Sequence, residues 1–279
     1  MKNLFHKLIF RIVKIDFLWL TLFPFVRLSS WLTFHRNVVV EKRTYPKTDG
    51  TLENICNSPI VKHGPFTGLI YPDFTSFGSA IFPKIIGCYE SEIHPAIEDV
   101  CNKNYSEVVD VGCAEGYYAV GLALRMKDSL IYAYDTDSKA AEYCEKLAEL
   151  NGVADRLTIR GQITSEDLRD FGFKRKGLIV CDCEGFEMDL FTRDNVANLS
   201  KCDLIIEMHD FVNINISIYI IDLFKDSHNI QLFQSVDDLV KARIYNYPET
   251  ADQDLETKKK LFAEGRPTLM EWAYLTSKV

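Results

Sequence analysis

Hydrophobic and polar positions follow two different periods from about residue 105 to the end of the chain. Short apolar runs rich in β-branched residues predict five strands, at residues 107–111, 130–134, 156–160, 177–181 and 203–208. The spacing of apolar positions predicts helices at 117–126, 138–150 and 214–224, and two later strands at 230–233 and 269–276. Strands that alternate with helices indicate βαβ units. We therefore expect an α/β fold with a mostly parallel sheet and helices on both faces.

The N-terminal segment has a different pattern, because it combines basic and apolar residues. Over residues 4–26, Lys7, Arg11 and Lys14 fall on one side of a helix, and Leu, Ile and Phe fill most of the other sides. The charges leave only residues 17–26 uninterrupted, which is too short to span about 30 Å of hydrocarbon. Two interpretations stay open: a helix that lies in a membrane surface, and a helix that covers a sheet or a partner chain.

The chain divides into three parts by composition. Residues 1–43 form a basic amphipathic extension, residues 44–84 carry five prolines and form an irregular cover segment, and residues 85–279 form the sheet domain. The net charge is −8, yet residues 1–43 hold eight Lys or Arg against two acidic residues, so the remainder is strongly acidic. An acidic body argues against a nucleic-acid partner, because contacts with phosphates need a basic surface.

Eight cysteines stand at irregular spacings, and none forms a Cys-x-x-Cys pair, which argues against a zinc ribbon or a thioredoxin-type site. Reduced thiols fit a cytoplasmic protein better than a disulfide scaffold. We expect a cytoplasmic location, at the inner face of a membrane if the N-terminal helix binds lipid. A homo-oligomer is left open.

A glycine-rich turn follows the first predicted strand, with the sequence Asp110-Val-Gly112-Cys-Ala114-Glu-Gly116-Tyr117. Small residues let the backbone turn sharply and approach a ligand, and the next helix begins there with free amide groups. A dinucleotide fingerprint would need Gly at 117, where Tyr stands. The spacing instead resembles motif one of the class I S-adenosylmethionine-dependent methyltransferases. The residues expected to contact this cofactor are Asp110, Gly112, Cys113, Ala114, Gly116 and Tyr117.

Two later strand ends complete the expected cofactor site. Asp135 ends the second strand, nineteen residues after Gly116, where an acid can accept hydrogen bonds from both ribose hydroxyls. Asp135 or Asp137 could also cap the helix at 138–150. Gln162, after the third strand, is placed to flank an adenine ring, although an ordinary loop is the alternative.

The string Asp182-Cys-Glu184-Gly-Phe-Glu187 after the fourth strand resembles the FkbM family of methyltransferases. Further stretches agree in order, over roughly residues 85–275: Ile86–Glu92, Asp110–Tyr117, Asp135 and Arg266–Trp272. The chain departs from the family at Cys113 and Ala114, where Glu or Asn is common, and at Asp135-Thr136, where Glu-Pro is common. The resemblance implies a Rossmann-like, seven-stranded class I methyltransferase fold. It also implies S-adenosylmethionine as the cofactor and methyl transfer to a hydroxyl of a sugar, glycan or similar small molecule.

Asp182, Glu184 and His209 are the candidate catalytic side chains. Two neighbouring carboxylates raise one pKa, which can suit a general base, and they can equally bind a hard cation. His209 follows the fifth strand and could accept the hydroxyl proton with Asp210 orienting it. The alternatives are that Asp182 contacts the sulfonium side of the cofactor, that Glu184 caps a helix, and that His209 and Asp210 form a structural pair.

Other functions stay open beside this one. A divalent metal is not expected, and if one binds, Asp182 and Glu184 are the expected ligands. The acceptor could be a nitrogen, or the reaction could be a metal-assisted O-methylation. From another class, the chain could be a non-catalytic nucleoside-binding or membrane-associated protein that keeps the fold. Glu90 and His94 are placed to reach the mouth of the pocket.

Overall fold

The computed structural model describes residues 24, 25, 28, 29, 32 and 51–279. The chain separates into two compact units, Met1–Thr51 and Leu52–Val279, and the sheet belongs to the second. The helix predicted over residues 4–26 lies outside the described residues, apart from 24 and 25. Residues 52–84, expected as a cover segment, belong to the same compact unit as the sheet.

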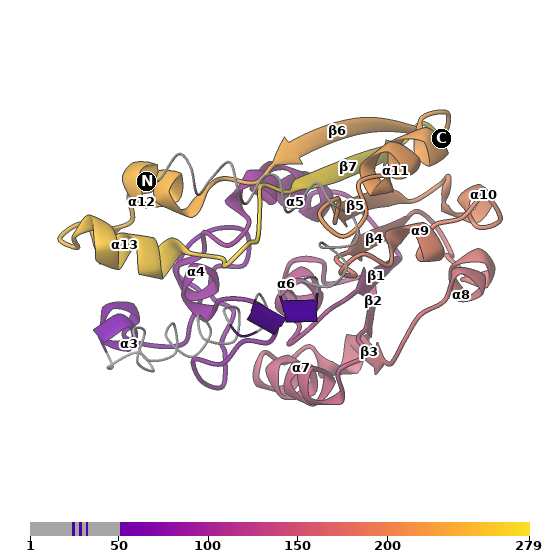
Figure 1. Cartoon of the computed structure of the whole chain (residues 1–279). Helices are drawn as coiled ribbons and strands as arrows, with labels where there is room; N and C mark the ends of the chain where they lie inside the picture. Colours follow the sequence, from indigo (N-terminus) through magenta and orange to yellow (C-terminus); the bar gives the residue numbers. More distant parts are fainter. Residues whose placement is uncertain (1–23, 26–27, 30–31, 33–50) are drawn as a thin grey trace, which may run out of the picture. The chain divides into compact units, whose positions relative to one another are not determined.

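A seven-stranded sheet forms the centre of this unit (Figure 1). Its strands are β1 (Glu107–Val111), β2 (Leu130–Tyr134), β3 (Leu157–Arg160), β4 (Gly177–Cys181), β5 (Asp203–Met208), β6 (His228–Gln234) and β7 (Glu271–Ser277). The strand order is β3-β2-β1-β4-β5-β7-β6, and β7 runs antiparallel between β5 and β6 while the other pairs are parallel. The predicted Rossmann-like, seven-stranded class I methyltransferase fold is confirmed.

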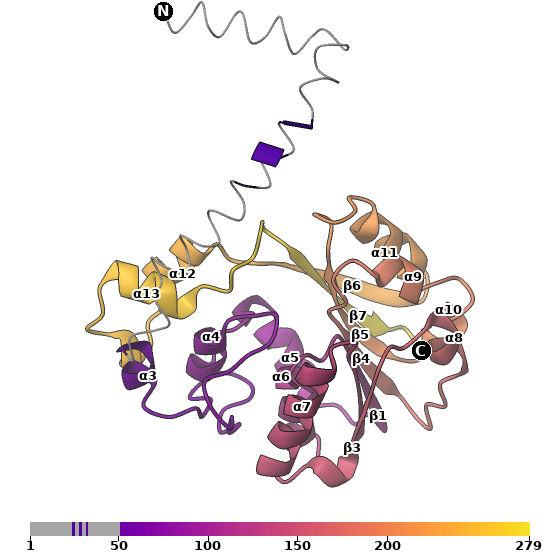
Figure 2. The same cartoon turned by 60° about the horizontal axis from the view of Figure 1, so that its bottom comes forward.

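Alternation along the central strands sends side chains into two separate cores. Val108 and Leu178 face a core with α5 (His94–Cys101), α6 (Tyr117–Arg125) and α7 (Ser138–Leu150). Val109 and Ile179 face the opposite core, with α8 (Ser165–Asp170), α9 (Glu187–Leu190), α10 (Val196–Leu199) and α11 (Ile216–Phe224). Figure 2 shows these two helical layers on opposite sides of the sheet. Burial on both faces explains why apolar residues stand at successive positions in these strands, as in Val108-Val109 and Leu178–Val180.

Side-chain caps fix where two of the helices begin. The Asp137 carboxylate accepts a hydrogen bond from the Lys139 N–H, so Asp137 rather than Asp135 caps α7. Thr164 and Asp167 form a reciprocal capping box at the start of α8. Asp135 therefore has no capping role and is free for another one.

The segments outside the central alternation were the least predictable. The cover segment contains α3 (Thr51–Cys56) and α4 (Ile81–Ile86), and Phe66 packs so closely on Gly121 of α6 that a Cβ there would lie 2.5 Å from its ring. Three short turns of helix were not predicted: η1 (Ser91–Ile93), η2 (Ala154–Arg156) and η3 (Pro248–Thr250). Two helices between β6 and β7 were also not predicted: α12 (Asp238–Ile244) and α13 (Leu255–Phe262). Within the described part of the chain, no helix is both long and apolar enough to cross a membrane.

Candidate active site

A cavity of about 540 Å³ opens at the carboxyl ends of the parallel strands. This volume is typical of small-molecule sites, which hold roughly 300–1,000 Å³, and its position is where ligands bind in open α/β sheets. The cavity is lined by nine of the predicted site residues: Gly112, Cys113, Ala114, Tyr117, Asp135, Gln162, Asp182, Glu184 and His209. Asp110 and Gly116 do not line it, because Asp110 is buried beneath the turn and Gly116 immediately precedes α6.

Gly112 allows the glycine turn to pass the end of β4. Its φ is +77°, and a Cβ at this position would lie 1.7 Å from the Asp182 carbonyl oxygen. The Asp182 N–H donates to the Val111 carbonyl at 2.9 Å, so the two strand ends are joined by their backbones. A side chain at 112 would separate them, which explains the glycine physically.

Asp135 ties the end of β2 to the glycine turn. Its Oδ2 accepts a hydrogen bond from the Ala114 N–H at 2.7 Å, and its Oδ1 accepts one from the Asp137 N–H at 2.8 Å. Each carboxylate oxygen can accept a second hydrogen bond. The half-buried carboxylate is therefore held in place with capacity left for a pair of ligand hydroxyls.

Two buried polar atoms beneath and beside the turn lack a hydrogen-bond partner among the described residues: Asp110 Oδ2 and the Tyr117 hydroxyl. Burial, with the nearby Asp182 charge, raises the pKa of Asp110 to about 8. Buried groups of this kind are uncommon unless a ligand or water satisfies them. Asp110 itself does not line the cavity, so its carboxyl supports the turn from beneath.

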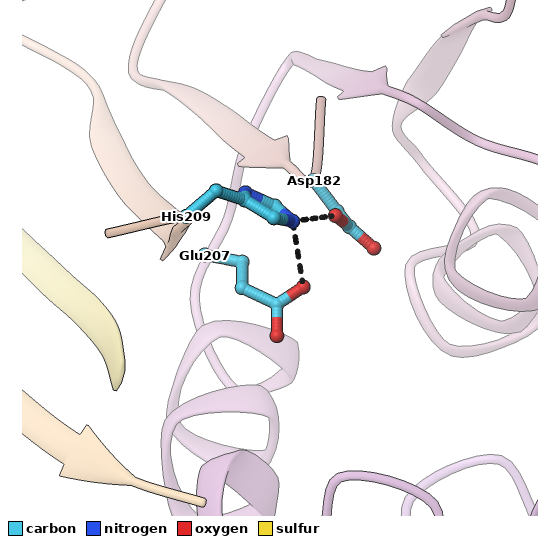
Figure 3. Close-up of side chains that lie close together, drawn as sticks. All are labelled: Asp182, Glu207 and His209. Carbon is cyan, nitrogen blue, oxygen red and sulfur yellow. Dashed lines mark ion pairs between the residues drawn. The ribbon is translucent and has the colours of Figure 1, made fainter. Parts of the chain in front are cut away.

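His209 stands at the opposite end of the cavity, among carboxylates. Its Nδ1 lies 2.6 Å from Glu187 Oε1, and its Nε2 lies 3.3 Å from Asp182 Oδ1 and 3.7 Å from Glu207 Oε2. Figure 3 shows Asp182 and Glu207 both facing Nε2. The expectation that Asp210 orients His209 is wrong, because Asp210 accepts the Ser217 N–H at 2.8 Å and Glu187 holds the imidazole instead.

The protonation of His209 follows from these neighbours. Burial opposes its charge, but hydrogen bonds and charges from Asp182 and Glu187 raise the pKa of His209 to about 11. These neighbours therefore stabilise the doubly protonated imidazole. That state donates hydrogen bonds and does not accept a proton, so the predicted role of His209 as the base is not favoured in this state and stays a prediction.

Glu184 is differently placed from its neighbours. It follows Asp182 by two residues, has a φ of +55°, and its side chain is 75% exposed. Its Oε2 lies 3.5 Å from His209 Nε2. Glu184 therefore lies at the open side of the cluster and does not cap a helix.

Arg266 was quoted in the sequence pattern, but its role was not predicted. Its guanidinium contacts the carboxylates of Glu207, Glu90 and Glu264 from the loop before β7. Burial raises the pKa of Glu207 well above its ordinary value, and the nearby Asp182 charge raises it further. Glu90 lines the cavity as expected, whereas His94 does not and instead contacts the Tyr89 carbonyl oxygen.

Glu115, inside the glycine turn, connects the turn to the cover segment. Its carboxylate lies 2.5 Å from Lys84 Nζ and accepts hydrogen bonds from Ser76 Oγ at 2.7 Å and from the Phe77 N–H at 3.0 Å. Burial opposes its charge, but Lys84 and these donors together hold the pKa of Glu115 below its ordinary value. Because Phe77 and Lys84 also line the cavity, the cover segment forms one of its walls.

A family model for ribosomal protein L11 methyltransferase (PrmA) matches residues 94–182. The match runs from the start of α5 to Asp182, so it includes the glycine turn and Asp135 but not the loops after β5. The predicted methyltransferase enzyme is confirmed at the level of this class, because a methyltransferase model matches this segment and the sheet has the class I order. An FkbM-like subfamily is not confirmed.

Several solved structures are similar in part. They include a precorrin 8W decarboxylase from Methanobacterium thermoautotrophicum (14% identity, 66% of this chain and 89% of that chain, TM-score 0.45). A precorrin-6y C5,15-methyltransferase from Geobacter metallireducens is also similar (11% identity, 66% of this chain and 88% of that chain, TM-score 0.43). A third is an rRNA methylase from Streptococcus thermophilus (14% identity, 67% of this chain and 97% of that chain, TM-score 0.44). These likenesses are too distant to say anything about the acceptor of this chain.

Proposed function

We propose that the protein transfers a methyl group from S-adenosylmethionine to a hydroxyl of a sugar, glycan or similar small molecule. One observation carries this proposal. A single cavity joins a nucleoside-type end, with the glycine turn and Asp135, to an acceptor end where Asp182, Glu207 and His209 converge. An enzyme that transfers a group between two small molecules must bind both of them next to each other in one cavity.

The residues present fit the cofactor. Asp135 has free hydrogen-bonding capacity for ribose hydroxyls, and Gln162 lines the cavity after β3, on the adenine side. The glycine turn brings backbone amides close to the ligand, and the Asp182 carboxylate faces the expected sulfonium side. When bound, S-adenosylmethionine would supply a methyl group on a positively charged sulfur.

The acceptor end of the cavity favours a hydroxyl. Carboxylate oxygens accept the hydrogen bond that a hydroxyl donates, and the Asp182 and Glu184 carboxylates both line the cavity. Methyl transfer is an in-line displacement, in which holding the acceptor oxygen in position supplies much of the rate. Asp182, Glu184 and His209 are therefore proposed to position the acceptor, and one group must also remove its proton.

The charge of the chain supports a small acceptor over a nucleic acid. Residues 44–279 are strongly acidic, and the acceptor end of the cavity adds Asp182, Glu184 and Glu207. Phosphate backbones bind basic surfaces. We propose no nucleic-acid partner and a cytoplasmic location, with the basic N-terminal extension able to contact a membrane surface.

The proposal is tested first by binding and then by turnover. Calorimetry of the full chain with S-adenosylmethionine is expected to give one site, and NAD is expected not to compete. Methyl transfer is then measured with radiolabelled cofactor against polyols, sugars, catechols and matched amines. Labelling of amines alone would replace the hydroxyl acceptor by a nitrogen acceptor, and tight NAD binding without S-adenosylmethionine binding would contradict the proposal.

A further inference from the structure

Three ligand atoms of types that bind metal ions converge at the acceptor end of the cavity. Asp182, Glu207 and His209 each offer one oxygen or nitrogen, and these atoms all lie within 4.8 Å of one another (Figure 3). Asp182 follows β4, whereas Glu207 and His209 belong to the end of β5, so two adjacent strands of a rigid sheet fix the positions. A cation between the three atoms would contact all of them after small side-chain movements.

Glu187 orients the imidazole in the way a metal ligand requires. Its carboxylate lies 2.6 Å from Nδ1 of His209, and both side chains are buried. A carboxylate on one ring nitrogen leaves the other nitrogen free to bind a metal, an arrangement that is common behind histidine ligands. Here the other nitrogen, Nε2, faces Asp182 and Glu207.

The cluster also gathers four carboxylates around one imidazole. The carboxylates of Asp182, Glu184, Glu187 and Glu207 all lie within 3.7 Å of a His209 nitrogen. Arg266 contacts Glu207 but is shared with Glu90 and Glu264. Asp182 Oδ1 is buried and lies 3.3 Å from His209 Nε2, so this oxygen faces the cluster.

We propose that Asp182, Glu207 and His209 bind one divalent cation of the Mn²⁺ or Zn²⁺ type, with Glu187 as the positioning residue for His209. An imidazole nitrogen beside two carboxylate oxygens suits a first-row divalent metal better than Ca²⁺ or Mg²⁺, which prefer oxygen ligands alone. The ligand set differs from the pair expected from sequence, because Glu207 and His209 replace the exposed Glu184.

The site has a role in methyl transfer that rests on the proposed function, whereas cation binding does not. A divalent ion that contacts the acceptor oxygen lowers the pKa of the hydroxyl and fixes its position. Two adjacent hydroxyls would bind such an ion better than one, because they can occupy two of its free positions. This favours acceptors with vicinal hydroxyls, as in sugars and catechols.

The test measures binding of the metal alone to the full chain. Titration with MnCl₂, followed by loss of the free Mn²⁺ signal in electron paramagnetic resonance, is expected to give one site per chain, displaced by Zn²⁺. Asp182→Asn and His209→Gln each remove a ligand and are expected to abolish this site. Glu187→Gln keeps all three ligands and is expected to weaken binding by about 10–100-fold.

Asp210→Asn is the matched control, because it removes the same charge next to His209 while its carboxylate contacts Ser217 instead. It is expected to retain the Mn²⁺ site. Circular dichroism melts establish that each variant is folded, and the two ligand variants are independent if one fails. Full Mn²⁺ binding by both ligand variants, or none by the wild type, would overturn the inference. Retained S-adenosylmethionine binding in the same samples would leave the proposed function standing.

Discussion

The Lys84 ammonium lies 2.5 Å from the Glu115 carboxylate, and both side chains are closed to solvent. Lys84 belongs to α4 in the cover segment, whereas Glu115 lies inside the glycine turn after β1. One buried ion pair therefore fastens the wall of the cavity to the loop that forms its floor. The position of the cover segment depends on a contact made 31 residues away in sequence.

Removing one partner of this pair is expected to be costly. Lys84→Met leaves the Glu115 charge buried and unpaired, and such changes lose about 3–5 kcal/mol of unfolding free energy. Chemical denaturation measures this loss. Lys146→Met, at an exposed position of α7, is the control and is expected to change stability by less than about 0.5 kcal/mol. Equal stabilities for the two variants would show that the pair does not hold the cover segment.

The pH dependence of stability is expected to report on Asp110. Burial raises its pKa from 3.8 in an unfolded chain to about 8 in the folded protein. The folded state therefore holds a proton that the unfolded state releases, and stability is lost as pH rises from about 4 to about 8. Asp110→Asn has no carboxyl to titrate, so it removes this contribution to the pH dependence of the unfolding free energy.

The difference in unfolding free energy between Asp110→Asn and the wild type is therefore expected to shift in favour of the variant as pH rises. The shift is at most about 1.4 kcal/mol for each pH unit. Denaturant titrations at several pH values measure it, and Asp128→Asn at an exposed position is the control. A difference that is constant between pH 4 and pH 8 would show that Asp110 is ionised in the folded protein.

Asp135 is expected to dominate recognition of the nucleoside. Asp135→Ala removes a carboxylate that is already oriented by two backbone N–H groups, and the expected loss in S-adenosylmethionine binding is about 1.5–3 kcal/mol. Calorimetry measures the change. Asp137→Ala, which removes the cap of α7 instead, is expected to affect stability more than affinity, so the reverse result would contradict the assignment.

Changes to Asp182 and His209, at the acceptor end of the cavity, are expected to lower turnover without a matching loss of cofactor affinity. His209→Gln and Asp182→Asn are expected to lower the rate by about 10²–10⁴-fold, whether the residues move a proton or hold the ion that activates the hydroxyl. S-adenosylmethionine affinity is expected to change little in His209→Gln. Near-normal turnover in both folded variants would remove these residues from the mechanism.

The basic N-terminal segment makes a separate prediction from sequence alone. Lys7, Arg11 and Lys14 each contribute about 1 kcal/mol near an anionic membrane surface. Co-sedimentation of the full chain with phosphatidylserine vesicles is expected to weaken with salt. It is also expected to be lost in the triple Glu substitution of these three residues. Salt-independent sedimentation, equal for both chains, would favour a helix that covers protein instead.

The central strands could be predicted almost to the residue, because each has a short apolar segment rich in β-branched residues between polar turns. β1, β2, β4 and β5 begin and end where the sequence places them. The helices α12 and α13 could not, since they are short and belong to a long excursion between two antiparallel strands. Their positions depend on packing with each other and with the cover segment, and local periodicity carries little of that information.

Some residues of the candidate site could be predicted from the sequence, and others could not. Gly112, Asp135 and Asp182 were predictable, because each follows a recognisable strand and the strand ends meet at one edge. Glu187 and Glu207 were not, although Glu187 ends the string that begins at Asp182 and Glu207 lies in the fifth predicted strand. The fold brings Glu187, at the start of α9, against Nδ1 of His209, whereas Glu207 reaches Nε2 from two residues earlier on β5. Asp210 was the nearer residue in sequence, and proximity in sequence gave the wrong partner.

The antiparallel insertion of β7 has a consequence for how the chain is made. β5 emerges from the ribosome long before its neighbour β7, which pairs with it along Leu204–Met208. Until then β5 has an open edge, and open strand edges recruit strands from other chains. A premature stop between residues 216 and 270 would make this exposure permanent. It would also remove Arg266, or leave it without the β7 strand that follows it. Such truncated chains are expected to accumulate as aggregates that chaperones and proteases clear, and not as soluble fragments with residual binding.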